Sequence, residues 1–202
     1  STYAATTIFS HFVALDSNKS LHFLKIASNG LAVYAIDKAT NAVGTPVTIT
    51  TTASTIVKSC FMITSTTAVV FYGEDTGNLR AVVVTLSSAT TLAVGSAAVL
   101  TATGAAVEDF YGAPKIAQLD TTLYLVSYAT ATGAGTTSVA GLQVSAGTTV
   151  TFGSPVNIIA ANNCINSTQT YKITTLTGFV LYKSGAAAPY ANSGVVVSVT
   201  NA

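Results

Sequence analysis

The sequence predicts an all-β protein built from four tandem units of about four antiparallel strands each, arranged as a β-propeller. Short runs of five to eight residues are rich in Val, Ile, Thr, Tyr and Phe, and they are bounded by Gly, Asn, Asp and Ser. Helix formers are scarce, since Glu occurs only twice and no apolar pattern of period 3.6 lasts two turns. The same order of runs recurs along the whole chain, which indicates a repeat protein.

The repeat divides a single domain, residues 1–202, into units at approximately 11–59, 60–113, 114–170 and 171–202. The first expected strands are 11–15, 60–64, 114–119 and 171–176. The second are 21–26, 68–72, 123–128 and 179–182, and the third are 31–36, 79–86, 139–144 and 195–199. The fourth strands each open with a glycine and a small residue, at Gly44, Gly95 and Gly153.

A sheet of this composition cannot bury both of its faces alone, so each unit is expected to stack on the next. Such a stack makes either a four-bladed ring or a part of a larger ring, and a β-sandwich is the alternative. Three of the second strands end on a tyrosine in register, at Tyr72, Tyr128 and Tyr182, which predicts packing between sheets. Asp16, Asp37 and Asp120 fall in turns, where Asp commonly binds the nearby backbone.

The fourth unit stops after its third strand. Residues 4–12 align with residues 53–61, a connector between units, and so do not supply the missing strand directly. Three alternatives remain: residues 1–8 complete the last sheet through a very short crossover, the last sheet has only three strands, or a neighbouring chain or removed segment supplies the strand. An open edge would expose unpaired backbone groups that pair with another strand.

Composition excludes several classes of protein. Half of the residues are hydrophobic and 7% are charged, which argues against a disordered chain. Thr, Ser and Gly interrupt every apolar run, so no membrane insertion is expected. Eight basic and seven acidic residues leave a net charge of only +1. Because so small a charge does not attract phosphate groups, nucleic acid is not an expected partner. The chain lacks a signal peptide and an initiator Met, which indicates that it begins after processing or is a fragment.

The titratable groups do not predict an enzyme. The adjacent acidic pairs, 74–75 and 108–109, would point to opposite faces if they lay on strands. The two imidazoles, His11 and His22, have no spacing typical of a zinc site or a catalytic triad. We therefore expect no catalytic residue, no metal site and no cofactor.

The loops after the second and fourth strands of each unit are the longest and most varied, and they emerge on one side of the expected scaffold. Tyrosines there can stack on sugar rings, while Asp and Asn side chains can bind hydroxyl groups. The candidate ligand-binding residues are Asp75, Asn78, Tyr111, Asn163 and Tyr190. Ordinary surface loops are the alternative explanation.

The two cysteines, Cys60 and Cys164, allow one disulfide, and two buried thiols are the alternative.

Three segments, LAVYAIDKATNAVGTPVTI, LRAVVVTLSSATTLAVGSAAVL and SVAGLQVSAGTTVTFGSPVNI, carry a resemblance to known proteins. They resemble repeats in the tail-fibre, spike and capsid-surface proteins of bacteriophages and large viruses. The resemblance implies a propeller-like module on a virion surface or outside the cell, serving in capsid decoration or host attachment. The implied partners are other virion proteins, copies of the chain itself or a host surface glycan. A glycan-binding lectin is the alternative function, followed by a secreted hydrolase.

Overall fold

The structure is a computed structural model that describes residues 9–26, 30–52, 54–74, 78–100, 114–129, 137–145, 148–159, 169–184 and 191–200. These residues form strands, turns and loops, and none of them lies in a helix. The strands make four antiparallel sheets that follow one another along the chain. The prediction of an all-β fold of tandem units is confirmed.

The strands are as follows. Sheet 1 holds β1 (Phe9–Ala14), β2 (Lys19–Lys25), β3 (Leu31–Asp37), β4 (Ala42–Val43) and β5 (Val47–Thr50). Sheet 2 holds β6 (Ser54–Thr64), β7 (Thr67–Glu74), β8 (Leu79–Leu86), β9 (Leu92–Val94) and β10 (Ala98–Leu100). Sheet 3 holds β11 (Lys115–Gln118), β12 (Leu123–Ala129), β13 (Thr137–Ser145), β14 (Thr149–Phe152) and β15 (Val156–Ile159). Sheet 4 holds β16 (Gln169–Lys172), β17 (Thr177–Ser184) and β18 (Ala191–Ser198).

The outer strand of each complete sheet is split in two, which the sequence did not reveal. β4 and β5 both pair with β3, and the same arrangement recurs in sheets 2 and 3. The predicted fourth strands correspond to the second halves, which follow the break at the glycine. The first halves were missed because two to four residues are too short to give a periodic signal.

The connector prediction was wrong for part of sheet 2. β6 begins at Ser54, so most of the expected connector 53–61 belongs to a strand that pairs with β7. Its register shifts between Ser54 and Val57 and again between Val57 and Ser59. These irregularities disturb the alternation of side chains that would have indicated a strand.

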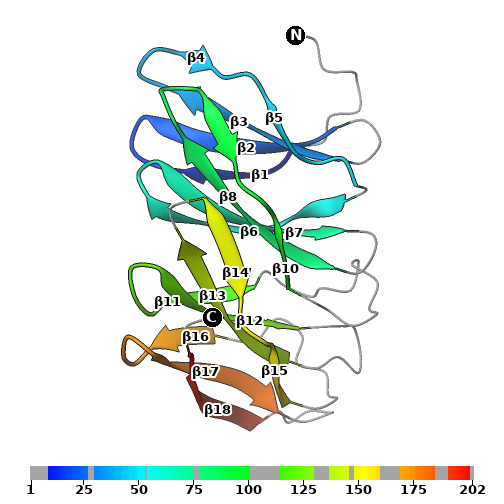
Figure 1. Cartoon of the computed structure of the whole chain (residues 1–202), viewed down its shortest axis with the longest axis vertical. Helices are drawn as coiled ribbons and strands as arrows, with labels where there is room; N and C mark the ends of the chain where they lie inside the picture. The colour runs from blue at the N-terminus through cyan, green and yellow to red at the C-terminus, as the bar shows by residue number, and fades with distance from the viewer. Residues whose placement is uncertain are drawn as a thin grey trace.

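The four sheets are stacked in chain order along the longest axis of the molecule, as Figure 1 shows. Sheet 1, in blue and cyan, lies at one end, and sheet 4, in orange and red, lies at the other. The stack is therefore an open series and not a closed four-bladed ring. Four sheets in series also rule out a simple two-sheet sandwich.

One backbone hydrogen bond recurs in all four units and fixes their alignment. A residue at or next to the end of the third strand donates its N–H to a carbonyl in the turn between the first two strands. The four donor–acceptor pairs are Lys38 to Asn18 (2.7 Å), Leu86 to Thr66 (2.7 Å), Val144 to Thr122 (2.9 Å) and Val199 to Leu176 (2.8 Å). Positions in different sheets can therefore be compared residue by residue.

Apolar side chains fill the three spaces between consecutive sheets. β7 is buried at all eight positions, because its alternate residues face sheet 1 and sheet 3. Each fully buried Val or Phe contributes about 1.5–3 kcal/mol through removal from water. Tyr72 and Tyr128 lie in these cores, as predicted, and Tyr182 is half-buried.

The turn prediction for the aspartates is also confirmed. Asp16 accepts hydrogen bonds from the backbone N–H groups of Asn18 and Lys19, both at 2.7 Å. These bonds hold the pKa of its carboxyl below the ordinary value. Asp37 and Asp120 accept bonds from the backbone of Ala39 and Thr121 in the same manner.

The glycines at the breaks form close contacts between consecutive sheets. A Cβ on Gly44 would overlap the carbonyl oxygen of Thr90 in sheet 2, and one on Gly95 would overlap that of Thr148 in sheet 3. The turn between the third strand and the outer strand of each sheet therefore rests on the glycine of the sheet before it. Gly153, at the same position in sheet 3, has no such neighbour among the described residues, and the nearest atoms are 3.9 Å from its ideal Cβ.

We expect Gly95→Ala to lower the free energy of unfolding by about 1–3 kcal/mol, because the added methyl group pushes on a backbone oxygen. Gly153→Ala is the matched control and should change stability by less than about 0.5 kcal/mol. Urea unfolding of the two variants provides the measurement. Equal losses at both positions would contradict the role assigned to the glycine contact.

Candidate interaction site

The outer edge of sheet 4 is the most distinctive feature of the fold. β3, β8 and β13 each pair with strands on both sides, whereas β18, their equivalent, pairs only with β17 among the described strands. The prediction that the fourth unit is one strand short is thus confirmed for the part of the chain that the structure describes. Residues 1–8, one possible source of the missing strand, lie outside it.

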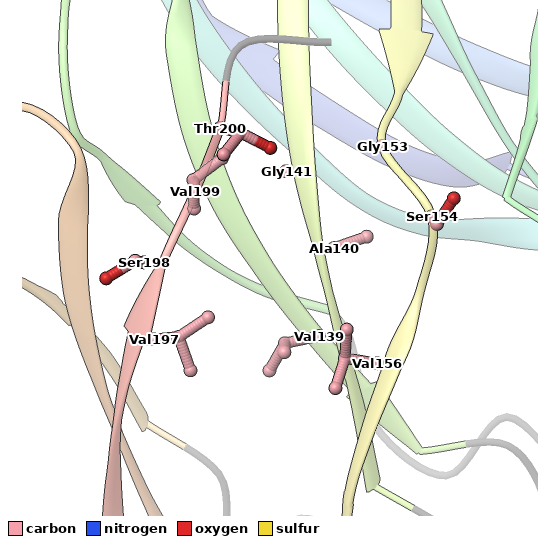
Figure 2. A pocket seen from close by; sticks show the side chains of 10 residues that line it. All are labelled: Val139, Ala140, Gly141, Gly153, Ser154, Val156, Val197, Ser198, Val199 and Thr200. Atoms are coloured by element: carbon pink, nitrogen blue, oxygen red, sulfur yellow. The ribbon is translucent and has the colours of Figure 1, made fainter.

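A groove of about 230 Å³ runs beside this edge, between sheets 3 and 4. It is lined by Val139, Ala140, Gly141, Gly153, Ser154, Val156, Val197, Ser198, Val199 and Thr200. Figure 2 shows residues 197–200 on one side of β13 and residues 153–156 on the other. The lining combines valine side chains with hydroxyl groups, so it suits an uncharged strand better than an ion.

The groove occupies the place that a turn fills in the earlier sheets. Thr90 covers Gly44 and Thr148 covers Gly95, but no described residue of sheet 4 covers Gly153. The N–H of Gly153 still donates to Gly141, at 3.0 Å, as its equivalents do in sheets 1 and 2. Sheet 3 therefore presents the same contact surface as sheets 1 and 2, and no described residue fills the equivalent position in sheet 4.

A second glycine fixes one wall of the groove. Val199 is buried against Gly141, where a Cβ would collide with the valine side chain. The hydrogen bond from Val199 N–H to the Leu176 carbonyl holds the same residue to the turn of its own sheet. The chain after β18 is thus pressed onto sheet 3 while its outer side stays open.

The structure describes only one of the five predicted ligand-binding residues. The four outside the described residues are Asp75, Tyr111, Asn163 and Tyr190. Asn78 is half-buried, and its backbone carbonyl accepts a hydrogen bond from the N–H of Glu74 at 3.0 Å. The glycan-binding site stays a prediction. Sequence reasoning missed the groove residues, although the repeated glycine at position 153 was a usable signal.

Glu74 forms an ion pair with Arg80. Its Oε2 lies 2.6 Å from Arg80 Nε, and its side chain is 4% exposed. The neighbouring Tyr72 has its pKa raised to about 12, first by burial and then by the Glu74 charge, against an opposing effect of Arg80. Asp75, Glu108 and Asp109 lie outside the described residues. Within the described ranges, no group of three His, Cys, Asp or Glu residues is placed to hold a metal ion.

Cys60 is a free thiol on β6, partly buried against the core between sheets 1 and 2. Burial raises the pKa of this thiol to about 12. Cys164 lies outside the described residues, so the disulfide between Cys60 and Cys164 and the alternative of two buried thiols both stay predictions.

At the other end of the stack, sheet 1 carries a row of rings across three strands. Phe12, His22 and Tyr34 are directly opposite one another in the register of β1, β2 and β3. Their centroids are 5.9 Å apart for Phe12 and His22 and 5.4 Å apart for His22 and Tyr34. Ser20 Oγ lies 2.9 Å from His22 Nε2. Burial, followed by the charge of Lys38, lowers the pKa of His22.

These features define an all-β stack of tandem, propeller-like antiparallel sheets with one incomplete terminal sheet. No protein-family model and no curated protein matches the chain. Among solved structures, it is similar to a subtype N11 neuraminidase-like protein of a flat-faced bat influenza virus, with a TM-score of 0.48 and 8% identity. The similarity covers 96% of this chain and 61% of that one, so the chain spans less than two thirds of that protein. No described helix is long and apolar enough to cross a membrane.

We expect Cys60 to react slowly with iodoacetamide in the folded protein, because a pKa of about 12 leaves roughly one thiolate in ten thousand at pH 8. Unfolding in urea should make the reaction fast. Peptide mapping by mass spectrometry separates Cys60 from Cys164, and comparison with and without a reductant shows whether they are bonded. Fast labelling of Cys60 in the native state would contradict its burial.

Acidification should destabilise the protein through His22. Its folded pKa lies below the unfolded value of 6.5, so the unfolded chain binds more protons between these two values. The stabilising contribution is full above pH of about 6.5 and declines as the pH falls toward the folded pKa. The melting temperature of the wild type should therefore drop more between pH 8 and pH 5 than that of His22→Gln. Identical drops would show that His22 is not the group responsible.

Proposed function

We propose that the chain is a non-enzymatic structural protein of a virion surface, a capsid decoration or host-attachment module that joins neighbouring proteins through sheet 4. The observation that carries this proposal is the open edge of β18 beside the groove at Gly153. A strand edge that has no neighbouring strand can bind another strand in the same way that a sheet extends itself.

The pairing of the earlier sheets describes the strand that would fit. Along β3, the partner binds in two short segments separated by a break at Gly44. A donor strand for β18 would follow the same path, with small residues where it crosses the groove. Main-chain hydrogen bonds would supply affinity, and the valines of the groove would select an apolar side chain.

The charge of the chain supports close packing among protein subunits. Eight basic and seven acidic residues leave a net charge of +1, and a net charge near zero favours association over repulsion. The Thr and Ser content provides neutral hydrogen-bonding groups for contacts with other coat proteins. The sequence resemblance to fibre, spike and capsid-surface repeats agrees with this role.

The test uses particles of the virus or phage that encodes the chain. Mass spectrometry of purified particles should detect it, and Gly153→Phe should reduce its incorporation, because the ring fills the groove while the fold has room for it. Val99→Phe, at an exposed position of β10, is the control and should be incorporated normally. Absence of the chain from particles would overturn the proposal. Normal incorporation of Gly153→Phe would show that the groove does not take part in binding to neighbouring proteins.

A glycan array separates this function from the lectin alternative. Selective binding to one class of sugar would assign recognition to the long loops and favour host attachment through a glycan. No binding to any class would leave the structural role alone.

A further inference from the structure

We propose that copies of this chain associate head to tail, with the outer face of sheet 4 in one copy docking on the outer face of sheet 1 in the next. This inference deepens the proposed function by naming a second copy as one of the neighbours. The sheet 4 outer face consists of Tyr171, Ile173, Phe179, Leu181, Gly194 and Val196. The sheet 1 outer face consists of Phe12, Ser20, His22, Tyr34, Ile36 and Val43.

The recurring hydrogen bond that aligns the units identifies the residues of sheets 1 to 3 that are equivalent to those of the sheet 4 outer face. By that alignment, Phe179 is equivalent to Leu21, Val69 and Leu125. Each of those three residues is fully buried and packs against the sheet that follows. In sheet 4, the same face looks away from sheet 3 and has no described sheet beyond it (Figure 1). Among the described residues, no sheet therefore covers the face that closes each internal interface.

Exposed apolar side chains gather at the two ends of the stack. Nine large hydrophobic residues of the described chain are exposed, and six of them lie on sheet 4 or on the sheet 1 outer face. These six are Phe12, Val43, Tyr171, Ile173, Leu176 and Val196. Exposed apolar residues that gather on one face are a common mark of an interaction site.

The sheet 1 outer face supplies the complementary half. His22 and Tyr34 are equivalent to Val70 and Val82, which receive sheet 1 within the chain. In the ring row of this face, Phe12 is exposed while His22 and Tyr34 are half-buried. Leu24 and Ala32, further along the same face, are already buried, so docking would use the part around Phe12.

The residues named for the two faces include no Asp, Glu, Lys or Arg. Lys183 shares the register of Phe179 and Leu181 at the end of β17, and the charge of Lys38 acts on His22, so the contact has to leave both lysines at its margin, in water.

A second copy fits better than an unrelated partner because the chain carries both halves of an interface that it already makes three times. Sheet 1 on sheet 2, sheet 2 on sheet 3 and sheet 3 on sheet 4 all use this pair of faces. A sheet 4 face against another sheet 4 face has no precedent within the chain. Since the two faces differ, the contact repeats from copy to copy and produces a ring or a fibre.

The area of the contact indicates how strongly two copies should associate. Three strands about 4.8 Å apart and about 20 Å long present a footprint of roughly 300 Å². Standard stable interfaces bury about 800 Å² of accessible surface on each partner. Association should therefore be weak in dilute solution and favoured at the high local density of a particle surface, where many contacts act together.

Sedimentation velocity across a range of protein concentrations tests the inference, using Val196→Asp to block the sheet 4 face and Phe12→Asp to block the sheet 1 face. The wild type should form a concentration-dependent series of oligomers, while each variant alone should associate at least about tenfold more weakly. A one-to-one mixture of the two variants should form dimers and nothing larger, because it retains one intact pair of faces. Val99→Asp is the matched control and should behave as the wild type, and circular dichroism checks that all variants are folded.

Each other outcome overturns the inference. A wild type that stays monomeric at millimolar concentration excludes head-to-tail association, even if the chain is found in particles and the proposed function stands. Self-association of Phe12→Asp at the wild-type level indicates contact between two sheet 4 faces. A mixture of the two variants that stays monomeric shows that the two faces do not bind each other.

Discussion

The fold depends on the need of each sheet to cover two apolar faces. β7 has no polar side, and neither face of sheet 2 or sheet 3 could remain in water without exposing a row of Val, Leu and aromatic side chains. Stacking covers both faces of sheets 2 and 3, but it leaves one face of sheet 1 and one face of sheet 4 without a described sheet against it. The edge of β18, the groove and the apolar end faces all lie where no further described sheet follows.

Much of the fold could be predicted from the sequence, because β-branched runs, turn residues and a repeat of about 50 residues are local signals. The strand β6 was placed too late because its bulges disturb the alternation on which such predictions depend. The open stack was only one of the forms considered, since the angle between sheets comes from contacts between units that no single run contains.

The candidate site was less accessible to sequence reasoning. The missing strand could be counted, but the groove arises where Gly141, Gly153 and Val199 meet from two sheets. The polar loop residues chosen for glycan binding reflect composition alone, and only Asn78 lies in the described chain. The place of His22 between Phe12 and Tyr34 comes from strand register that the sequence does not display.

The contact of a turn with a glycine also has a geometric consequence. Gly44 and Gly95 lie at the outer strands, so the absence of a side chain there lets the outer edges of consecutive sheets approach closely. In a fan of sheets, the outer separation sets the angle of each step, and the angle sets how many sheets complete a turn. A single hydrogen atom in place of a methyl group thus helps to determine the curvature of any larger arc that these units build.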